Sequence, residues 1–365
     1  MEKQQKKENS AQTTDFLDIP HFTDHKSEVY SLMEIALERG ASDLHLTAGN
    51  HPILRIDGKL IPIFERPKLT PGYIEKLVGF LITDEQKKSF DEEKELDFSY
   101  IFKDQAFLRA NAFYQKNSMA CVIRLISSQI KTITDLSLPP VVSRFTQEAQ
   151  GLVLVTGPTG SGKSTTIAAI LDEINRTRSE HILTIEDPIE YVFTSKQSII
   201  NQREVKRDAI SFKTALHSAL REDFNVILIG ELRDIDSISA ALTIAETGHL
   251  VFATIHASSA VMAPDRLINA FPPYYQAQVR TQLSHVLLGI VAQRLLPKMG
   301  GGRVPAVEVM LANNAVRNII QEGKNSQLKS IIETSSGEGM MTFEQSIAKL
   351  LEEKKISEDV VRRIR

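Results

Sequence analysis

The chain changes its pattern of hydrophobic and polar positions near residue 150. Before that point, short runs alternate between apolar and polar residues, as in SDLHLTA, PILRIDG, KLIPIFE, FLRANAFYQ and MACVIRLI. Alternation with a period of two predicts strands that bury one face. Apolar residues at helical spacing predict one helix from Val29 to Leu37 and another near Pro71 to Leu81. Residues 28–130 are therefore predicted to form a smaller α+β domain.

From Gly151 onward, the strand-like runs are apolar at every position, as in LVLVT, HILTI, VILIG and HLVFATI. Strands without alternation are covered on both faces, which indicates a mainly parallel sheet with helices on each side. Beyond Ala260 the pattern is chiefly helical. The sequence therefore predicts an α/β domain over residues 148–365 with a helical C-terminal part.

Two segments fit neither pattern. Residues 1–27 are rich in Lys, Gln, Ser and Thr, a composition that cannot offset the entropy of ordering, so they are predicted to be a disordered polar tail. Residues 131–147 show no clear period and contain Pro139-Pro140, so they are predicted to be a linker or hinge between the two domains.

Composition narrows the classes of function. The chain has 365 residues, enough for two domains of about 150 residues each. Its 43 basic residues against 46 acidic ones give a net charge of −3, so no global basic field favours nucleic acid as a partner. Cys121 is the single cysteine, which excludes an internal disulfide or a multi-cysteine zinc site. Neither a signal-peptide pattern nor a run of about 18 apolar residues is present, so we expect a cytoplasmic protein without direct membrane insertion.

One local motif points to specific chemistry. The phosphate-binding pattern G-x-x-x-x-G-K-[ST] occurs as Gly157, Pro158, Thr159, Gly160, Ser161, Gly162, Lys163 and Ser164, between a strand-like run and a helix-like run, and Thr165 follows it. The glycines let backbone N–H groups approach phosphate oxygens, and the helix N-terminus adds its positive end. Lys163 would reach the β- and γ-phosphates, and the Ser164 hydroxyl would ligate Mg²⁺. The motif therefore predicts a site for ATP and Mg²⁺.

Hydrolysis also needs carboxylates that organise metal and water, and two apolar strands end in acidic residues. HILTIEDPIEY places Glu186 at one strand end, and VILIGELRD places Glu231 after another. Ligands of open α/β sheets bind at the carboxyl ends of parallel strands, so both acids are predicted to lie near the phosphate loop. Many P-loop ATPases have an Asp for Mg²⁺ at the end of the second strand, where this chain has Gly230. We therefore assign the metal to Ser164, water, and Glu186 or Glu231.

These motifs, in their order, resemble the nucleotide motifs of the secretion ATPase superfamily. GPTGSGKSTT corresponds to its Walker A motif, TIEDPIEY to its Asp box, ILIGELRD to Walker B and TGHLVFATIH to its His box. The likeness continues through GASDLHL, RIDGKL, AQRLLP and GRVPAVEVM, from Val29 to the C-terminus. Within the superfamily, the chain resembles the PilT-type ATPases, which retract type IV pili in twitching motility. The resemblance implies a RecA-like P-loop ATPase core preceded by a PAS-like domain.

The resemblance also implies roles for individual residues. Glu231 would be the base that polarises the attacking water, and Glu186 would assist metal or water. His249 and His256 would sense the γ-phosphate side of the site. The two histidines are seven residues apart, which puts them on opposite faces of a straight strand, so a bend or a strand end must separate their roles.

Arginine fingers from the first domain are a further implication of the resemblance. Arg109 in FLRANAFYQ and Arg124 in CVIRLI match strands whose arginines reach a nucleotide across the interdomain cleft or a subunit boundary. Such an arginine contributes about 10³–10⁵ in rate. Arg221 and Arg233, on either side of the Walker B strand, are weaker candidates. The family forms homohexameric rings at the inner membrane, acts on a pilus platform protein there, and uses rotation of the N-terminal domain on the linker as its power stroke.

Two departures from the family pattern leave an alternative open. The family signature AIRNLIRE reads AVRNIIQE here, from Ala315 to Glu322, and the segment before Walker B reads REDFN, which places Glu222 where an amide is usual. The first hypothesis is a hexameric ATP-driven motor for pilus retraction. The alternative is an accessory or regulatory paralogue that binds ATP and assists a main retraction ATPase. A third class is a soluble P-loop kinase, but the occurrence of the four family motifs in order argues against it.

Overall fold

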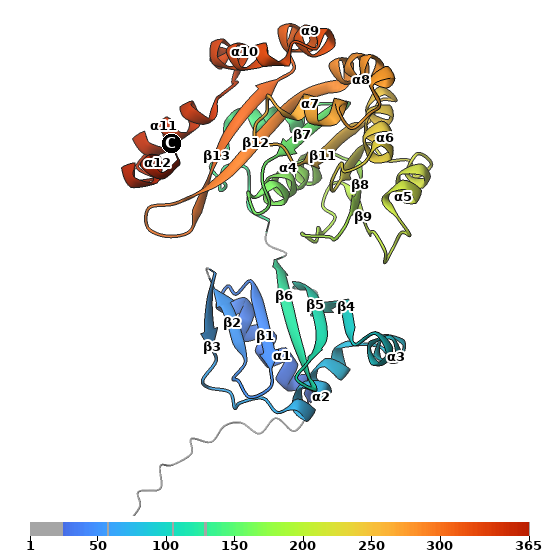
Figure 1. The fold of residues 1–365 in the computed structure, drawn as a ribbon, viewed down its shortest axis with the longest axis vertical. Helices are drawn as coiled ribbons and strands as arrows, with labels where there is room; N and C mark the ends of the chain where they lie inside the picture. Colours follow the sequence, from blue (N-terminus) through green and yellow to red (C-terminus); the bar gives the residue numbers. More distant parts are fainter. Residues whose placement is uncertain (1–24, 57, 104–105, 128–129, 365) are drawn as a thin grey trace, which may run out of the picture. The chain divides into compact units, whose positions relative to one another are not determined.

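The chain divides into two compact units, Met1–Ile126 and Ser127–Arg365 (Figure 1). The computed structural model describes residues 25–56, 58–103, 106–127 and 130–364. Most of the predicted tail, residues 1–24, lies outside the described residues, and residues 25–27 belong to the first helix. Along the described part of the chain, no helix combines the length and apolar character needed to cross a bilayer.

The first unit is a six-stranded sheet with helices packed on it, as the α+β prediction requires. The strand order is β3-β2-β1-β6-β5-β4, and the strand pairs with described register are antiparallel. The elements are α1 (His25–Glu38), β1 (Asp43–Thr47), β2 (Ile53–Ile56), β3 (Lys59–Pro62), α2 (Pro71–Leu81), α3 (Asp84–Glu93), β4 (Glu95–Phe102), β5 (Ala106–Gln115) and β6 (Ser118–Ser127).

Helix α3 and strand β4 were not predicted. The α3 sequence, DEQKKSFDEE, is polar on nearly every side and buries only Phe90, so it lacks the apolar stripe by which a helix is recognised. A capping box supports it instead, because Thr83 and Gln86 exchange side-chain to backbone hydrogen bonds at its N-terminus.

The second unit is a seven-stranded sheet covered by helices, which confirms the predicted α/β architecture. The strand order is β13-β12-β7-β11-β10-β8-β9. The strands are β7 (Gly151–Thr156), β8 (His181–Glu186), β9 (Ile199–Glu204), β10 (Val226–Ile229), β11 (Leu250–Ile255), β12 (Leu287–Pro297) and β13 (Arg303–Leu311). The helices are α4 (Lys163–Thr177), α5 (Phe212–Ala219), α6 (Ile235–Glu246), α7 (Ala263–Ile268), α8 (Pro273–Val286), α9 (Asn314–Glu322), α10 (Leu328–Thr334), α11 (Phe343–Glu352) and α12 (Glu358–Ile364), with 3₁₀ helices η1 (Pro140–Thr146), η2 (Asn325–Gln327) and η3 (Ser336–Glu338).

Both faces of the second sheet are buried. Successive side chains of a strand point to opposite faces, so Leu152 and Leu154 of β7 pack under α6 and α8 while Val153 and Val155 pack under α4 and η1. This double cover explains why β7, β10 and β11 are buried at every position and do not alternate.

The prediction for the C-terminal part of this unit missed two strands. The region beyond Ala260 is chiefly helical, as expected, but it also contains β12, which runs parallel to β7, and β13, which is antiparallel to β12. These strands are buried at most positions, so no alternation marked them in the sequence. A continuous apolar run does not by itself distinguish a buried strand from a buried helix.

Residues 131–147 are not a free linker. Val141, Val142 and Phe145 of η1 are buried in the core of the second unit. The Arg144 guanidinium donates to the Glu338 carbonyl at 2.9 Å, which ties the segment to η3. Pro139 and Pro140 therefore begin a packed 3₁₀ helix, and the boundary between the units lies near Ser127. Proline suits the first turn of a helix, because its missing N–H would have no partner there.

Candidate functional site

The phosphate loop runs from β7 into α4, and its glycines are required by the backbone. Gly157, Gly160 and Gly162 have φ of 147°, 76° and 90°, a region that other residues rarely adopt. Two of them also lack room for a side chain. A Cβ atom on Gly157 would lie 2.4 Å from the Gln293 carbonyl oxygen, and one on Gly162 would lie 2.7 Å from Gln293 Nε2.

Gln293 holds this loop from the neighbouring strand β12. Its side chain is buried, its Nε2 donates to the Ser161 carbonyl at 2.8 Å, and its Oε1 accepts from the Thr166 hydroxyl at 2.7 Å. Both ends of the amide are thus paired, which fixes the start of α4 against β12. The sequence analysis quoted AQRLLP but did not single out Gln293, because a contact over 132 positions leaves no local signal.

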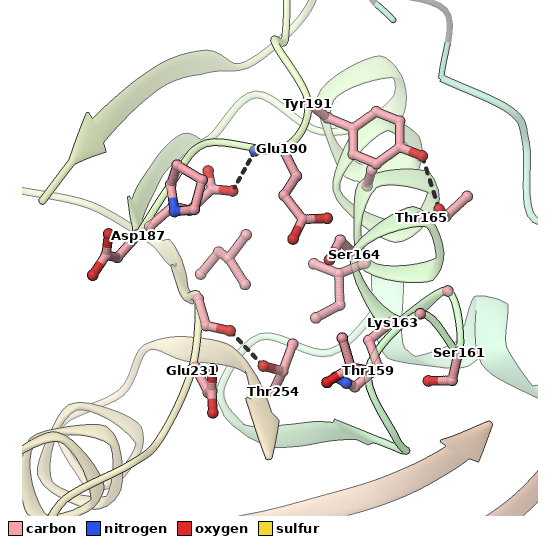
Figure 2. Close-up of a pocket in the computed structure, with 18 of the residues that line it drawn as sticks. Thr159, Ser161, Lys163, Ser164, Thr165, Asp187, Glu190, Tyr191, Glu231 and Thr254 are labelled. Atoms are coloured by element: carbon pink, nitrogen blue, oxygen red, sulfur yellow. Dashed lines mark hydrogen bonds between the residues drawn. The ribbon is translucent and has the colours of Figure 1, made fainter. Parts of the chain in front are cut away.

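The loop forms one wall of a cavity of about 490 Å³ (Figure 2). Its lining includes most of the predicted phosphate-binding residues together with side chains that follow β8, β10 and β11. These are Thr159, Gly160, Ser161, Gly162, Lys163, Ser164, Thr165, Glu186, Asp187, Glu190, Tyr191, Glu231, Arg233 and His256. The cavity therefore lies at the carboxyl ends of parallel strands, where the sequence placed it.

Lys163 folds back over the phosphate loop. Its ammonium donates to the carbonyls of Gly157 and Pro158, at 2.8 and 3.1 Å. Burial lowers the pKa of Lys163, and the nearby Glu231 and Glu190 carboxylates offset this lowering only in part. An anionic phosphate could replace the two carbonyl partners and would favour the charged form of the lysine.

Glu231 lies two residues after β10, among basic groups. Its Oε2 accepts from Arg233 Nη2 at 2.7 Å, and its Oε1 lies 3.1 Å from His256 Nε2. Burial by itself would raise the pKa of Glu231, but Arg233, His256 and Lys163 outweigh it, so the pKa lies below its ordinary value. Glu231 is therefore an ionised acceptor at neutral pH, with both oxygens already paired.

The two acids of the Asp box differ in what they can reach. Glu186, at the end of β8, is buried, and its oxygens accept from the Thr184 hydroxyl at 2.7 Å and the Glu190 backbone N–H at 3.5 Å. Burial raises the pKa of Glu186 to about 7. Glu190 is exposed, and Figure 2 shows its carboxylate pointing into the cavity. The geometry thus favours Glu190, which the sequence analysis had not named, over Glu186 for contact with metal or water.

The structure separates the two predicted histidines by the whole of β11. His256 follows the strand and lines the cavity, whereas His249 precedes it. Six strand residues at about 3.3 Å each put the two ends about 20 Å apart. The His249 ring packs on Phe224, and its Nδ1 lies 3.2 Å from the Ile244 carbonyl oxygen. His249 therefore does not reach the phosphate loop of its own unit, and the shared sensing role is not supported for it.

The predicted arginine fingers of the first unit lie on adjacent strands. Arg109 is on β5, opposite Ser99 of β4. Arg124 is on β6, and its Nε donates to the buried Asp43 at 3.0 Å while 67% of its side chain remains exposed. Most of the Arg124 side chain therefore remains exposed although it pairs with Asp43.

The departure at Glu222 lies outside the cavity. Its carboxylate accepts from Arg203 Nη1 at 2.6 Å and from the Ser218 hydroxyl at 3.1 Å. Neither Glu222 nor Arg221 belongs to the described lining of the cavity, whereas Arg233 does. The acid therefore serves an ion pair between β9 and the end of α5 and does not add charge to the phosphate site.

The altered C-terminal signature forms α9. Arg317, which the chain keeps, donates to the backbone carbonyls of Ser284 and His285, both at 2.6 Å, and so caps the end of α8. Two of the three changes, at Val316 and Ile319, replace one aliphatic side chain by another on the packed side of the helix. The third, Gln321, is exposed.

The oxygen donors of the cavity fit a cation that the nucleotide helps to hold. Within the described residues, no group of three or more His, Cys, Asp or Glu side chains could hold a metal by itself. Mg²⁺ prefers one or two carboxylates or hydroxyls together with water and substrate phosphates. Ser164, Glu190 and Glu231 offer such a partial set.

The chain matches a known protein family over most of its length. Residues 26–301 match the family model described as type II/IV secretion system protein. The type IV pilus retraction ATPase PilT of Pseudomonas aeruginosa is 45% identical, over 92% of this chain and 97% of its own. The type IV pilus ATPase PilU of the same organism is 37% identical, over 88% of this chain and 85% of its own.

A solved structure extends the likeness to the fold. The crystal structure of the pilus retraction motor PilT with bound ADP matches with a TM-score of 0.84 at 46% identity, over 90% of this chain and 94% of that one. The similarity therefore covers both the sequence and the fold. The chain belongs to the type II/IV secretion system protein family, and within that family it is similar to the PilT-type retraction ATPases.

Proposed function

We propose that the protein is an ATP-hydrolysing motor that powers type IV pilus retraction. The observation that carries this proposal is the cavity in which Lys163 and the phosphate loop face the ionised Glu231. The similarity to PilT at 45% identity over nearly the whole chain supplies the mechanical role.

In this proposal the residues have separate roles in ATP hydrolysis. Lys163 exchanges its two backbone carbonyl partners for phosphate oxygens, and the backbone N–H groups of the loop hold the triphosphate. Mg²⁺, bound with the nucleotide, would neutralise the charge that develops on the β- and γ-phosphates. Glu231 accepts a hydrogen bond from the attacking water once Arg233 or His256 has released one of its oxygens.

The mechanical part of the proposal concerns assembly. We infer a homohexamer in the cytoplasm, peripheral at the inner membrane, that acts on a platform protein of the pilus machine. Arg109 and Arg124 stabilise the transferring phosphoryl group from the first unit of the same or a neighbouring subunit. Because residues 131–147 are packed on the second unit, we assign the pivot of the interdomain rotation to the boundary near Ser127 instead of Pro139-Pro140.

Steady-state ATP hydrolysis per subunit, measured against protein concentration, tests the enzyme and its assembly together. We expect wild-type turnover to rise with concentration, because the proposed active form is a hexamer, and to disappear in Glu231→Gln, which should still bind ATP. Lys163→Ala should lose nucleotide binding in titration calorimetry. Equal loss of binding in both variants, or turnover independent of concentration, would contradict these roles.

The accessory or regulatory paralogue remains the second candidate because the PilU relative is also similar, at 37% identity. Expression in a bacterium that lacks its own retraction ATPases separates the two. Restored twitching with this chain alone supports the main motor. Restoration only when a second retraction ATPase is present supports the accessory role.

A further inference from the structure

The loop that carries Glu190 into the cavity has no regular structure of its own. Residues 187–198 between β8 and β9 form neither helix nor strand. Glu190 and Tyr191 project from this loop toward the phosphate loop, and the Tyr191 hydroxyl lies 2.8 Å from the Thr165 hydroxyl (Figure 2). Something outside the loop must therefore fix the direction of Glu190.

Side chains of β8 and β9 pair with the backbone of this loop. The Ile189 N–H donates to Glu204 at 3.1 Å, and the Glu190 N–H donates to Glu186 at the longer distance of 3.5 Å. Gln202 makes two bonds, since its Oε1 accepts from the Phe193 N–H at 2.8 Å and its Nε2 donates to the Tyr191 carbonyl at 2.8 Å. Buried backbone groups need such partners wherever no ladder supplies them.

Gln202 also links the loop to the buried carboxyl group at the end of β8. It pairs in register with Thr184, whose hydroxyl donates to Glu186, and its Nε2 lies 3.4 Å from Glu186 Oε1. The side chain at this position therefore has to donate to the Tyr191 carbonyl and to the Glu186 carboxyl group, and it has to accept from the Phe193 N–H. Only a neutral amide of this length meets all three requirements.

We propose that Gln202 is a positioning residue of the hydrolysis reaction, which fixes the Asp-box loop so that Glu190 points at the metal and water side of the phosphate cavity. This inference rests on the proposed ATPase function. Gln202 does not belong to the described lining of the cavity, so it acts through Glu190 and Tyr191, which do. The phosphate loop does not depend on it, because Gln293 holds that loop from the other side.

The test compares two variants with matched controls on the same strand. Gln202→Met keeps the size and removes the hydrogen bonds to Phe193, Tyr191 and Glu186. Gln202→Glu turns the donor into an acceptor that faces the Tyr191 carbonyl and Glu186. The controls are Asn201→Met and Asn201→Asp, because Asn201 is exposed and is the neighbouring residue of β9. Each full-length protein is measured for ADP affinity, kcat for ATP and hydrogen exchange by peptide.

We expect exchange in peptides over residues 187–194 to accelerate about tenfold in both Gln202 variants, and exchange over residues 157–166 to stay as in the controls. We expect kcat to fall about 10- to 100-fold, since small misplacements of a reacting group have effects of that size, while ADP affinity stays within about twofold.

Three results would overturn the inference. Unchanged exchange over residues 187–194 would mean that Gln202 does not hold the loop. Faster exchange with wild-type kcat would mean that the loop position does not matter for turnover, and equal acceleration over residues 157–166 would mean a general loss of stability. A wild type without turnover would refute the proposed ATPase function, and with it the catalytic part of this inference, whereas the exchange data would still decide whether Gln202 holds the loop.

Discussion

The buried carboxyl group of Glu186 makes a quantitative prediction about stability. Burial raises its pKa from the ordinary 4.5 to about 7, against the lowering by hydrogen bonds from Thr184, Glu190 and Gln202. Between these two pH values the folded state binds more protons than the unfolded state, so the free energy of unfolding falls as the pH rises. Each pKa unit corresponds to about 1.4 kcal/mol, which gives a loss of about 3 kcal/mol once the pH exceeds both values.

Glu186→Gln removes this pH dependence, because glutamine resembles the protonated carboxyl group and can accept the same hydrogen bond from Thr184. Relative to wild type, we expect the variant to gain about 2–3 kcal/mol more stability at pH 8 than at pH 5. Urea unfolding followed by circular dichroism measures the difference, since the chain contains no tryptophan. Titration of the other groups is common to both proteins and cancels in the comparison.

A matched control is Glu358→Gln, which makes the same chemical change at a side chain of α12 that is 76% exposed. There the difference from wild type should not change with pH by more than about 0.5 kcal/mol, as for most surface positions. If Glu186→Gln behaves like this control, the Glu186 carboxyl group is ionised in the folded protein at pH 5. Its description as a buried, proton-retaining group would then be refuted.

Three further perturbations address the phosphate site. Gln293→Ala leaves two buried polar groups without partners, so the free energy of unfolding should fall by about 2–5 kcal/mol and ADP affinity should also fall. An unchanged ADP affinity in calorimetry would show that Gln293 does not order the loop. Arg233→Ala removes a group that lowers the pKa of Glu231, so the acid limb of the kcat profile should move to higher pH, and an unmoved limb would exclude Glu231 as the titrating base. Arg109→Ala and Arg124→Ala should each lower kcat by up to about 10³-fold with ADP affinity retained, and wild-type turnover in both would remove the arginine-finger assignment.

The fold was predictable where the pattern of a segment reports its surroundings directly. Helix α2 has the predicted bounds Pro71–Leu81, because it has a clear apolar stripe and begins with proline. The buried strands β7, β10 and β11 were found from continuous apolar runs. Continuous apolar runs did not reveal β12 and β13, and η1 was predicted to be a linker. In those segments burial comes from neighbours far along the chain, which the local pattern does not show.

The functional site likewise has a part that the sequence predicted and a part that it did not. The phosphate loop is a contiguous motif, since its glycines, Lys163 and Ser164 bind one ligand with consecutive residues, and the sequence alone determined it. The sequence placed His249 and His256 on either side of a strand-like run, and the structure shows that this run is β11, which separates them by its full length. Only the tertiary structure decided that Glu190 faces the cavity while Glu186 is buried, and that Gln293 and Gln202 hold the two walls. Those contacts join residues on different strands, and the packing of the sheet brings them together.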